Sequence, residues 1–192
     1  SVVWTAFDAC GNSTTCTQTV VVLDLELPTI TCPPALTDVP TDLNLCSASG
    51  VILGAPVATN DNCGILIVTN NAPAVFPHGT TVVQWTVVDT SGNVNVCNQS
   101  VTVQDHQAPL ITCVPNKTAE YTDSWTFDGP SASDNCDVPV ISVLSTVTNG
   151  LCGKTYSATR TWVAVDTSGN SNTCSQVVTV VDTTAPLIVC AP

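Results

Sequence analysis

In this chain of 192 residues, aspartate and asparagine side chains recur at regular spacings, and together they could bind a metal ion. The loop Asp-x-Ser-Gly-Asn occurs at residues 89–93 and again at residues 166–170. Its side-chain oxygens suit Ca²⁺, which takes roughly six to eight oxygen ligands. The same residues also suit a tight turn that Asp caps through its backbone, and no EF-hand spacing decides between the two interpretations. The candidate calcium ligands are Asp24, Asp61, Asp89, Asn93, Asp105, Asp166 and Asn170.

Eleven cysteines and no methionine predict disulfide chemistry rather than metal or catalytic chemistry. Such cysteine usage is typical of an oxidising compartment. No Cys-x-x-Cys pair occurs, and His78 and His106 stand apart from the cysteines, which argues against zinc. Neither histidine has a Ser or Cys nucleophile at a recognised spacing. We therefore expect no enzyme and no catalytic residue.

One stretch, Val82–Asp105, occurs three times and sets the organisation of the chain. Its tryptophan falls at Trp4, Trp85 and Trp162, so the offsets are 81 (85 − 4) and 77 (162 − 85). Self-similarity at such a period indicates a tandem array of small domains. We expect each tryptophan to lie in the core of its own module.

The elements that position these residues are predicted to be strands. Cysteine, glutamine and two valines alternate on one face of Thr14–Leu23, the pattern of a half-buried strand. No segment has a helical period, and turns recur roughly every 8–12 residues, so an Ig-like β-sandwich is the predicted fold. The inward glutamine should bond to backbone groups.

The module boundaries follow from the repeat. Each copy ends in Asp, three residues and Pro, and linkers so short leave little hinge freedom. The prediction is an all-β chain of tandem Ig-like sandwich modules joined end to end by Pro-containing linkers and stapled by disulfides. The expected domains are residues 1–26 (the end of a truncated module), 27–107 and 108–184 (complete modules), and 185–192 (the first strand of a following module).

The four cysteines of each complete module allow three connectivities. The first and last strands of an Ig-like sandwich lie side by side, which favours the pairs Cys32–Cys97 and Cys113–Cys174 and leaves Cys46–Cys63 and Cys136–Cys152. Cys10, Cys16 and Cys190 then lack partners and should pair beyond this fragment of a longer chain. A strand-exchange polymer is the rival explanation, but residues 1–26 and 185–192 together make under half of a module.

The charge of the chain excludes two classes of partner. Lys117, Lys154 and Arg160 are the only basic residues against 15 acidic ones, for a formal net charge of −12. Nucleic acids and anionic membranes are bound through Lys and Arg, so neither is expected as a partner. No apolar run approaches the roughly 18 residues of a membrane span, so no insertion is expected.

In combination, four motifs resemble the hyalin-repeat (HYR) family. They are Pro-x-Ile-x-Cys, Asp-Asn-Cys, Trp-x-x-x-Asp-x-Ser-Gly-Asn and Val-x-Val-x-Asp, and they cover both complete modules and both fragments. The resemblance implies Ig-like sandwiches in tandem, in extracellular proteins associated with adhesion. The loop variants Asp-Ala-Cys-Gly-Asn and Asp-Thr-Ser-Gly-Asn look most like the cell-surface adhesins and fibres of Bacteroidetes-type bacteria.

The expected function is therefore a non-catalytic structural segment of a long extracellular fibre or adhesin stalk at the cell surface. The alternative is an adhesion module that recognises a glycan or a protein, with Ca²⁺ as a cofactor. The expected partners are the neighbouring modules of the same chain, further copies in a filament formed through strand edges, and a glycan or other surface ligand.

Overall fold

The computed structural model describes residues 1–56 and 58–190, and over these residues the chain is all-β. The predicted fold class is confirmed. The same part of the chain contains no helix with the length and hydropathy of a membrane span. The chain splits into two compact units, and residues of the first complete repeat belong to both. Unit 1 comprises Ser1–Ala35, Leu53–Ala72 and Val82–Gln99, and unit 2 comprises Leu36–Ile52, Pro73–Thr81 and Ser100–Pro192.

The first complete repeat is built on a four-stranded sheet in the order β4-β10-β9-β7, with the two-stranded sheets β3-β6 and β5-β8 beside it. β4 pairs with β10 in parallel, whereas β7 and β9 are antiparallel. The strands are β3 (Thr29–Thr31), β4 (Leu36–Pro40), β5 (Ser47–Ser49), β6 (Ala58–Asn60), β7 (Ile65–Asn70), β8 (Val75–Pro77), β9 (Gly79–Asp89) and β10 (Val94–Gln104).

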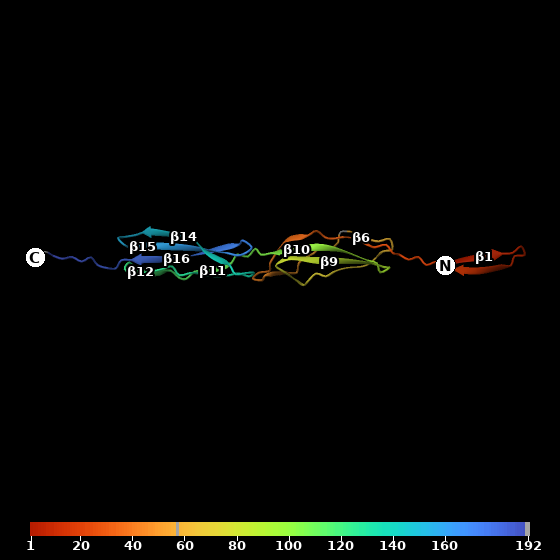
Figure 1. The fold of residues 1–192 in the computed structure, drawn as a ribbon, viewed down its shortest axis with the longest axis horizontal. Helices are drawn as coiled ribbons and strands as arrows, with labels where there is room; N and C mark the ends of the chain where they lie inside the picture. The colour runs from red at the N-terminus through yellow and green to blue at the C-terminus, as the bar shows by residue number, and fades with distance from the viewer. Residues whose placement is uncertain (57, 191–192) are drawn as a thin grey trace. The chain divides into compact units, whose positions relative to one another are not determined.

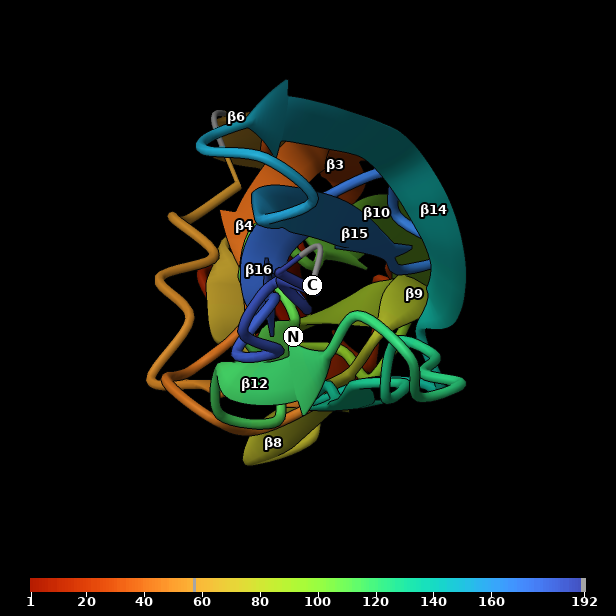
Figure 2. The same cartoon turned by 90° about the vertical axis from the view of Figure 1, so that its left-hand side faces the viewer.

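The second complete repeat also has a four-stranded sheet, but its described residues form one two-stranded sheet where the first repeat has two. Its four-stranded sheet runs β12-β16-β15-β14, with β12 parallel to β16, and its second sheet is β11-β13. Strands β14, β15 and β16 lie side by side in both views (Figures 1 and 2). The strands are β11 (Leu110–Thr112), β12 (Lys117–Glu120), β13 (Ser131–Ser133), β14 (Val140–Gly150), β15 (Tyr156–Val165) and β16 (Ser171–Val181).

The two ends of the chain differ from the predicted strands. The N-terminal copy forms the hairpin β1 (Val2–Phe7) and β2 (Ser13–Gln18), so the strand predicted to reach Leu23 ends five residues earlier. Residues 185–190, expected to be a first strand, are not a strand in the structure. A strand needs a neighbour for its backbone hydrogen bonds, and the described residues provide none to either segment.

The tryptophans show how burial depends on a complete module. Trp85 and Trp162 are each 6% exposed, as predicted for core residues, whereas Trp4 in the isolated hairpin is 60% exposed. In the second repeat, Trp162 packs with Ile111 and Ala164, so the β11-β13 sheet covers the face of β15 and β16. Among the described residues, the buried hydrophobic core therefore lies in the two complete repeats.

In the two complete repeats the inward glutamines, Gln99 and Gln176, are fully buried and bonded to the backbone, as predicted. Gln99 donates from Nε2 to the carbonyls of Pro34 (2.8 Å) and Leu53 (3.0 Å). Gln176 donates in the same way to the carbonyl of Pro115 (2.9 Å). Each glutamine thereby fastens the last strand of its repeat to the segment that follows the first strand. The prediction is wrong for Gln18 in the isolated hairpin, which is exposed and accepts the indole N–H of Trp4 at 3.1 Å.

Candidate cation site

The Asp-x-Ser-Gly-Asn loop of the first complete repeat is a capped turn between β9 and β10. Asp89 Oδ1 accepts the backbone N–H groups of Ser91 and Asn93, both at 2.8 Å, and Asn93 Nδ2 donates to Asp89 Oδ2 at 2.7 Å. Gly92 has a φ of 92°, the left-handed conformation that favours glycine. The turn interpretation of this loop is therefore confirmed.

The loop between β15 and β16 repeats this geometry. Asn170 donates its N–H to Asp166 Oδ1 at 2.7 Å and its Nδ2 to Asp166 Oδ2 at 2.8 Å. The asparagine amide also reaches the linker before the repeat. Asn170 Nδ2 bonds the carbonyl of Asp105 at 3.0 Å, and Asn93 Nδ2 bonds the carbonyl of Asp24 at 3.3 Å. Both asparagines, proposed as ligands through oxygen, thus act as donors that tie the turn to the linker.

The linker aspartate of the second repeat belongs to an acidic group that we call the Asp105 cluster: Asp105, Asp134 and Asp166. One carboxylate oxygen from each lies within 4.8 Å of the other two. Asp105 is 3% exposed and Asp166 is 7% exposed. Asp105 Oδ2 and Asp134 Oδ1 are buried and have no hydrogen-bond partner among the described residues. Such orphaned oxygens cost free energy unless a cation or water satisfies them.

The first repeat holds an equivalent group, the Asp24 cluster: Asp24, Asp61 and Cys63. Its ligand atoms also lie within 4.8 Å of one another, and Asp24 Oδ2 and Asp61 Oδ1 are again buried without a partner. Asp24 and Asp105 are 81 positions apart (105 − 24), and Asp61 and Asp134 are 73 apart (134 − 61). The same orphaned oxygens therefore occur at matching positions of two repeats.

The charges of these clusters are not neutralised by neighbouring basic side chains. The ion pairs of the described residues join Lys117 to Asp128 and His106 to Asp38, outside both clusters. Burial acts to raise the pKa of Asp105, but hydrogen bonds from Gln107 N–H and from Asn135 outweigh it, so the pKa is lowered. The carboxylate therefore stays charged at neutral pH, which a cation ligand requires.

Cys63 is chemically unlike the carboxylates beside it. Burial and the negative charge of Asp24 and Asp61 raise the pKa of its thiol. A protonated thiol is a poor metal ligand, because the thiolate is the form that binds. In the Asp24 cluster the two carboxylates are therefore the stronger ligands.

The structure both groups and extends the predicted ligands. It brings Asp105 and Asp166 together and places Asp24 beside Asp61. Asp89, fully buried, stays engaged in its own turn. The sequence prediction did not include Asp134, although Asp134 is the first residue of the second Asp-Asn-Cys motif, as the predicted ligand Asp61 is of the first. Comparing the two motifs would have found it.

The disulfides correct part of the predicted pairing. Cys32 is bonded to Cys97 and Cys113 to Cys174, with Cα–Cα distances of 5.8 and 5.7 Å. The other two predicted pairs, Cys46–Cys63 and Cys136–Cys152, are not formed, because Cys46 is bonded to Cys136. The prediction sought partners only within a module. The exposed free cysteines are Cys10, Cys16, Cys63, Cys152 and Cys190.

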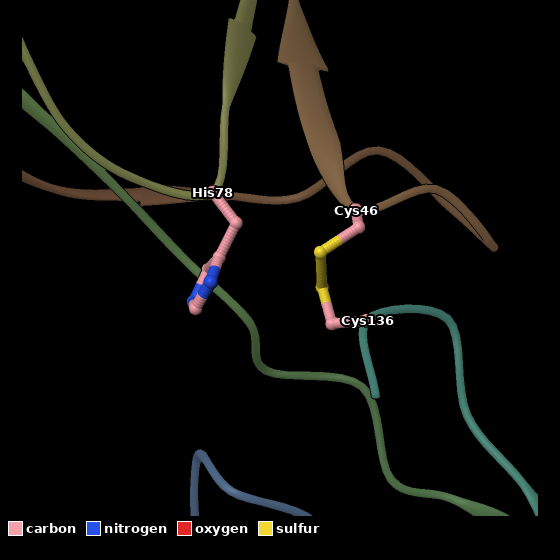
Figure 3. A group of neighbouring side chains, drawn as sticks. All are labelled: Cys46, His78 and Cys136. Atoms are coloured by element: carbon pink, nitrogen blue, oxygen red, sulfur yellow. A yellow bond between two sulfur atoms is a disulfide. The ribbon is translucent and has the colours of Figure 1, made fainter. Parts of the chain in front are cut away.

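His78 lies beside the Cys46–Cys136 disulfide, with its ring next to the two sulfurs (Figure 3). Three such side chains resemble the ligands of a transition metal. However, metal binding by cysteine requires thiolates, and here the sulfurs are bonded to each other. In this oxidised form the trio is not a metal site.

Comparison with known proteins agrees with the motifs. The model of the HYR domain matches residues 23–103 and 104–180. The chain belongs to the HYR domain family. The two matched segments also contain the Asp24 and Asp105 clusters, each with its linker aspartate near the start of a segment.

Animal proteins are among the relatives of the chain. It is 34% identical to hyalin of Strongylocentrotus purpuratus over 99% of its own length and 31% identical to hyalin of Lytechinus variegatus over 98%. It spans 17% and 38% of the lengths of these two hyalins. A Rattus norvegicus protein with sushi, von Willebrand factor type A, EGF and pentraxin domains is 28% identical over 54% of the chain. These animal relatives do not support the expected Bacteroidetes-type context.

Solved structures of protocadherins are also similar to the chain. The protocadherin γB4 extracellular domain is 12% identical, with a TM-score of 0.42, over 89% of this chain and 37% of its own. The PcdhgB3 EC1-4 structure is 9% identical, with a TM-score of 0.43, over 95% and 64%. At these scores the similarity carries no functional argument.

Proposed function

We propose that this segment is a non-catalytic structural stretch of an extracellular adhesive fibre, and that Ca²⁺ binds at the start of each of its HYR repeats. The supporting observation is the pair of orphaned, buried carboxylate oxygens at matching positions of two repeats: Asp24 Oδ2 with Asp61 Oδ1, and Asp105 Oδ2 with Asp134 Oδ1. Its partners in this proposal are the neighbouring repeats of the same chain.

The chemistry of the cluster favours calcium. Carboxylate oxygens are hard ligands, which Ca²⁺ accepts in flexible geometry, whereas Mg²⁺ demands a near-ideal octahedron. The Asp105 cluster combines a linker aspartate (Asp105) with an aspartate of Asp-Asn-Cys (Asp134) and an aspartate of the capped turn (Asp166). An ion bound there stabilises these three segments only when they are assembled, so its binding energy becomes folding energy.

The extracellular role has two supports. Three disulfides within 192 residues suit an oxidising compartment, and at least one links successive repeats. The tandem HYR arrangement and the hyalin relatives favour a repetitive structural chain. Calcium sites in extracellular modules typically have dissociation constants of about 10⁻⁴–10⁻³ M.

The experiment is thermal unfolding in Ca²⁺ and in EDTA. Ca²⁺ at about 100-fold above Kd should stabilise each of the two repeats by about 2.7 kcal/mol. In the variant Asp105→Asn/Asp134→Asn the gain at the second repeat should disappear. Asp123→Asn, which removes one charge from an exposed turn, is the matched control and should keep the full gain. Equal melting temperatures in Ca²⁺ and EDTA for the unmodified chain would overturn the cation site.

A further inference from the structure

The disulfide Cys46–Cys136 joins one HYR repeat to the next. Its Cα atoms are 4.7 Å apart, although the two cysteines are 90 positions apart in sequence. Cys136 ends the motif Asp-Asn-Cys, and Asn135 in that motif donates from Nδ2 to the carbonyl of Leu45 at 3.0 Å. The motif of the second repeat is thus held against the residue before Cys46.

Cys63 is the counterpart of Cys136 in the first repeat. Both are the third residue of Asp-Asn-Cys. The backbone N–H of Cys63 donates to Asp61 at 2.8 Å, and that of Cys136 donates to Asp134 at 2.9 Å. The local turn is therefore the same, but Cys63 is an exposed free thiol.

Cys152 is the counterpart of Cys46 in the second repeat, although the sequence hides this. The carbonyl of Cys46 accepts the N–H of His78 at 3.2 Å, and the carbonyl of Cys152 accepts the N–H of Thr155 at 2.9 Å. His78 directly precedes β9 and Thr155 directly precedes β15, and they are one repeat apart (155 − 78 = 77). Each cysteine thus touches the same backbone position of its repeat.

The surroundings of Cys152 match as well. The N–H of Asp182 donates to Thr155 Oγ1 at 3.3 Å, which places the turn of Cys152 beside the aspartate that ends the second repeat. In the first repeat, the aspartate at the corresponding place is Asp105 (182 − 105 = 77), and its Oδ1 accepts a hydrogen bond at 3.2 Å from Nδ2 of Asn135, the residue before Cys136. Cys46 and Cys152 are therefore both placed at the boundary with a following repeat.

From this correspondence we infer that Cys63 and Cys152 are halves of further inter-repeat disulfides. Cys152 bonds the cysteine of Asp-Asn-Cys in a following HYR repeat, and Cys63 bonds a boundary cysteine of a preceding one. The Cys46–Cys136 bond is then one member of a series that links each repeat covalently to the next.

The bond forms by thiol–disulfide exchange with an oxidant that is itself a disulfide. One cysteine thiolate attacks a sulfur of the oxidant, whose S–S bond breaks, and forms a mixed disulfide. The second cysteine thiolate displaces the remaining oxidant sulfur and forms the new S–S bond. The two cysteines lose two electrons and two protons, and the oxidant takes up both and leaves as two thiols.

The first test is differential alkylation of the full natural polypeptide, carried out in EDTA so that the result does not depend on the cation site. Free thiols are labelled first, disulfides are then reduced, and the released thiols receive a second label. We expect Cys63 and Cys152 to carry the second label, together with the internal reference cysteines 46 and 136. First-label modification of both Cys63 and Cys152 would overturn the inference.

The second test supplies the missing partner from the chain itself. Duplicating Asp105–Val181 directly after Val181 adds one repeat in register and gives Cys152 a following Asp-Asn-Cys. Mass spectrometry of a non-reduced digest should find Cys152 bonded to the added copy of Cys136. In the control Cys152→Ser, the added Cys136 should be a free thiol while Cys46–Cys136 persists. The inference is contradicted if, in the duplicated chain that keeps Cys152, the added Cys136 is a free thiol or is bonded to a cysteine other than Cys152.

Discussion

The Asp24 and Asp105 clusters are alike at two of their three members, whereas the third member is Cys63 in one and Asp166 in the other. Both contain a linker aspartate and an Asp-Asn-Cys aspartate with buried, unpartnered oxygens, and both lie beside a linker bonded by the asparagine of a capped turn. They differ at the cysteine, which is a thiol at Cys63 and a disulfide at Cys136. The cluster is thus encoded by each repeat and its linker, whereas the disulfide also needs the right residue in another repeat.

The largest expected effect is the loss of stability on removing the Cys46–Cys136 disulfide, which lies beside the Asp105 cluster and has no equivalent at the Asp24 cluster. Cys46→Ser/Cys136→Ser should lower the free energy of unfolding of the oxidised chain by about 3–4 kcal/mol, because the unfolded chain regains the entropy of a long closed loop. Urea denaturation measures the change. Both variants are made in the 192-residue segment, where Cys63 is an exposed free thiol, so Cys63→Ser is the control and its effect should stay within about 0.5 kcal/mol. Equal effects from both variants would mean that the bridge contributes nothing to stability.

The buried glutamines extend the comparison to the cores. Gln99→Leu should cost about 2–3 kcal/mol, because it orphans the indole N–H of Trp85, which Gln99 Oε1 accepts at 3.1 Å, and two carbonyls.

Gln176→Leu, the matched variant, should cost about 1–2 kcal/mol. It orphans the backbone N–H of Asp128 and one carbonyl, while the Asp128 carboxylate keeps Lys117 at 2.7 Å. Urea denaturation of the two variants compares them directly. A larger loss for Gln176→Leu would contradict this ranking.

Single carboxylate changes should sharpen the comparison of cation sites. At Ca²⁺ about 10-fold above Kd, each site should add about 1.4 kcal/mol. Asp105→Asn should remove the gain of the second repeat alone, and Asp24→Asn that of the first. Calorimetric calcium titration of each variant counts the remaining sites. If either variant abolished both sites, the two clusters would not be independent.

The smallest effect concerns pH in the absence of metal. Hydrogen bonds that outweigh burial lower the pKa of Asp89 and Asp105 in the folded chain. A lowered folded-state pKa contributes stability above the unfolded value of about 3.9, and this contribution is lost as pH falls through the folded pKa. The melting temperature in EDTA should therefore fall below about pH 4. The fall should be shallower in Asp89→Asn.

The sequence predicts local geometry well, because local geometry depends on neighbouring residues. The capped turn at Asp89 and the backbone bonds of Gln99 follow from spacing and strand parity. The burial of Trp85 follows from its place in a complete repeat, while Trp4 in the same motif is exposed because the described residues supply no opposite sheet to the isolated hairpin. Motifs therefore specify a side chain's direction but not what covers it.

The disulfide between repeats could not be predicted from spacing. Cys46 precedes Asp-Asn-Cys in its repeat, whereas Cys152 follows it, so alignment places the two cysteines at different positions. Their correspondence is visible only in the backbone bonds to His78 and Thr155. A bond between residues 90 positions apart depends on packing that no local pattern records.

The disulfides within repeats also determine how far the chain can be stretched. Tension applied along the chain passes from Cys32 directly to Cys97 and from Cys113 directly to Cys174. Between Cys32 and Cys174, only the 16 steps from Cys97 to Cys113 (113 − 97) can then lengthen, to about 56 Å at roughly 3.5 Å per residue. Without the bridges, the 142 steps from Cys32 to Cys174 (174 − 32) would reach about 500 Å. Even with every sheet unfolded, the oxidised chain between Cys32 and Cys174 can therefore lengthen only within this short connection.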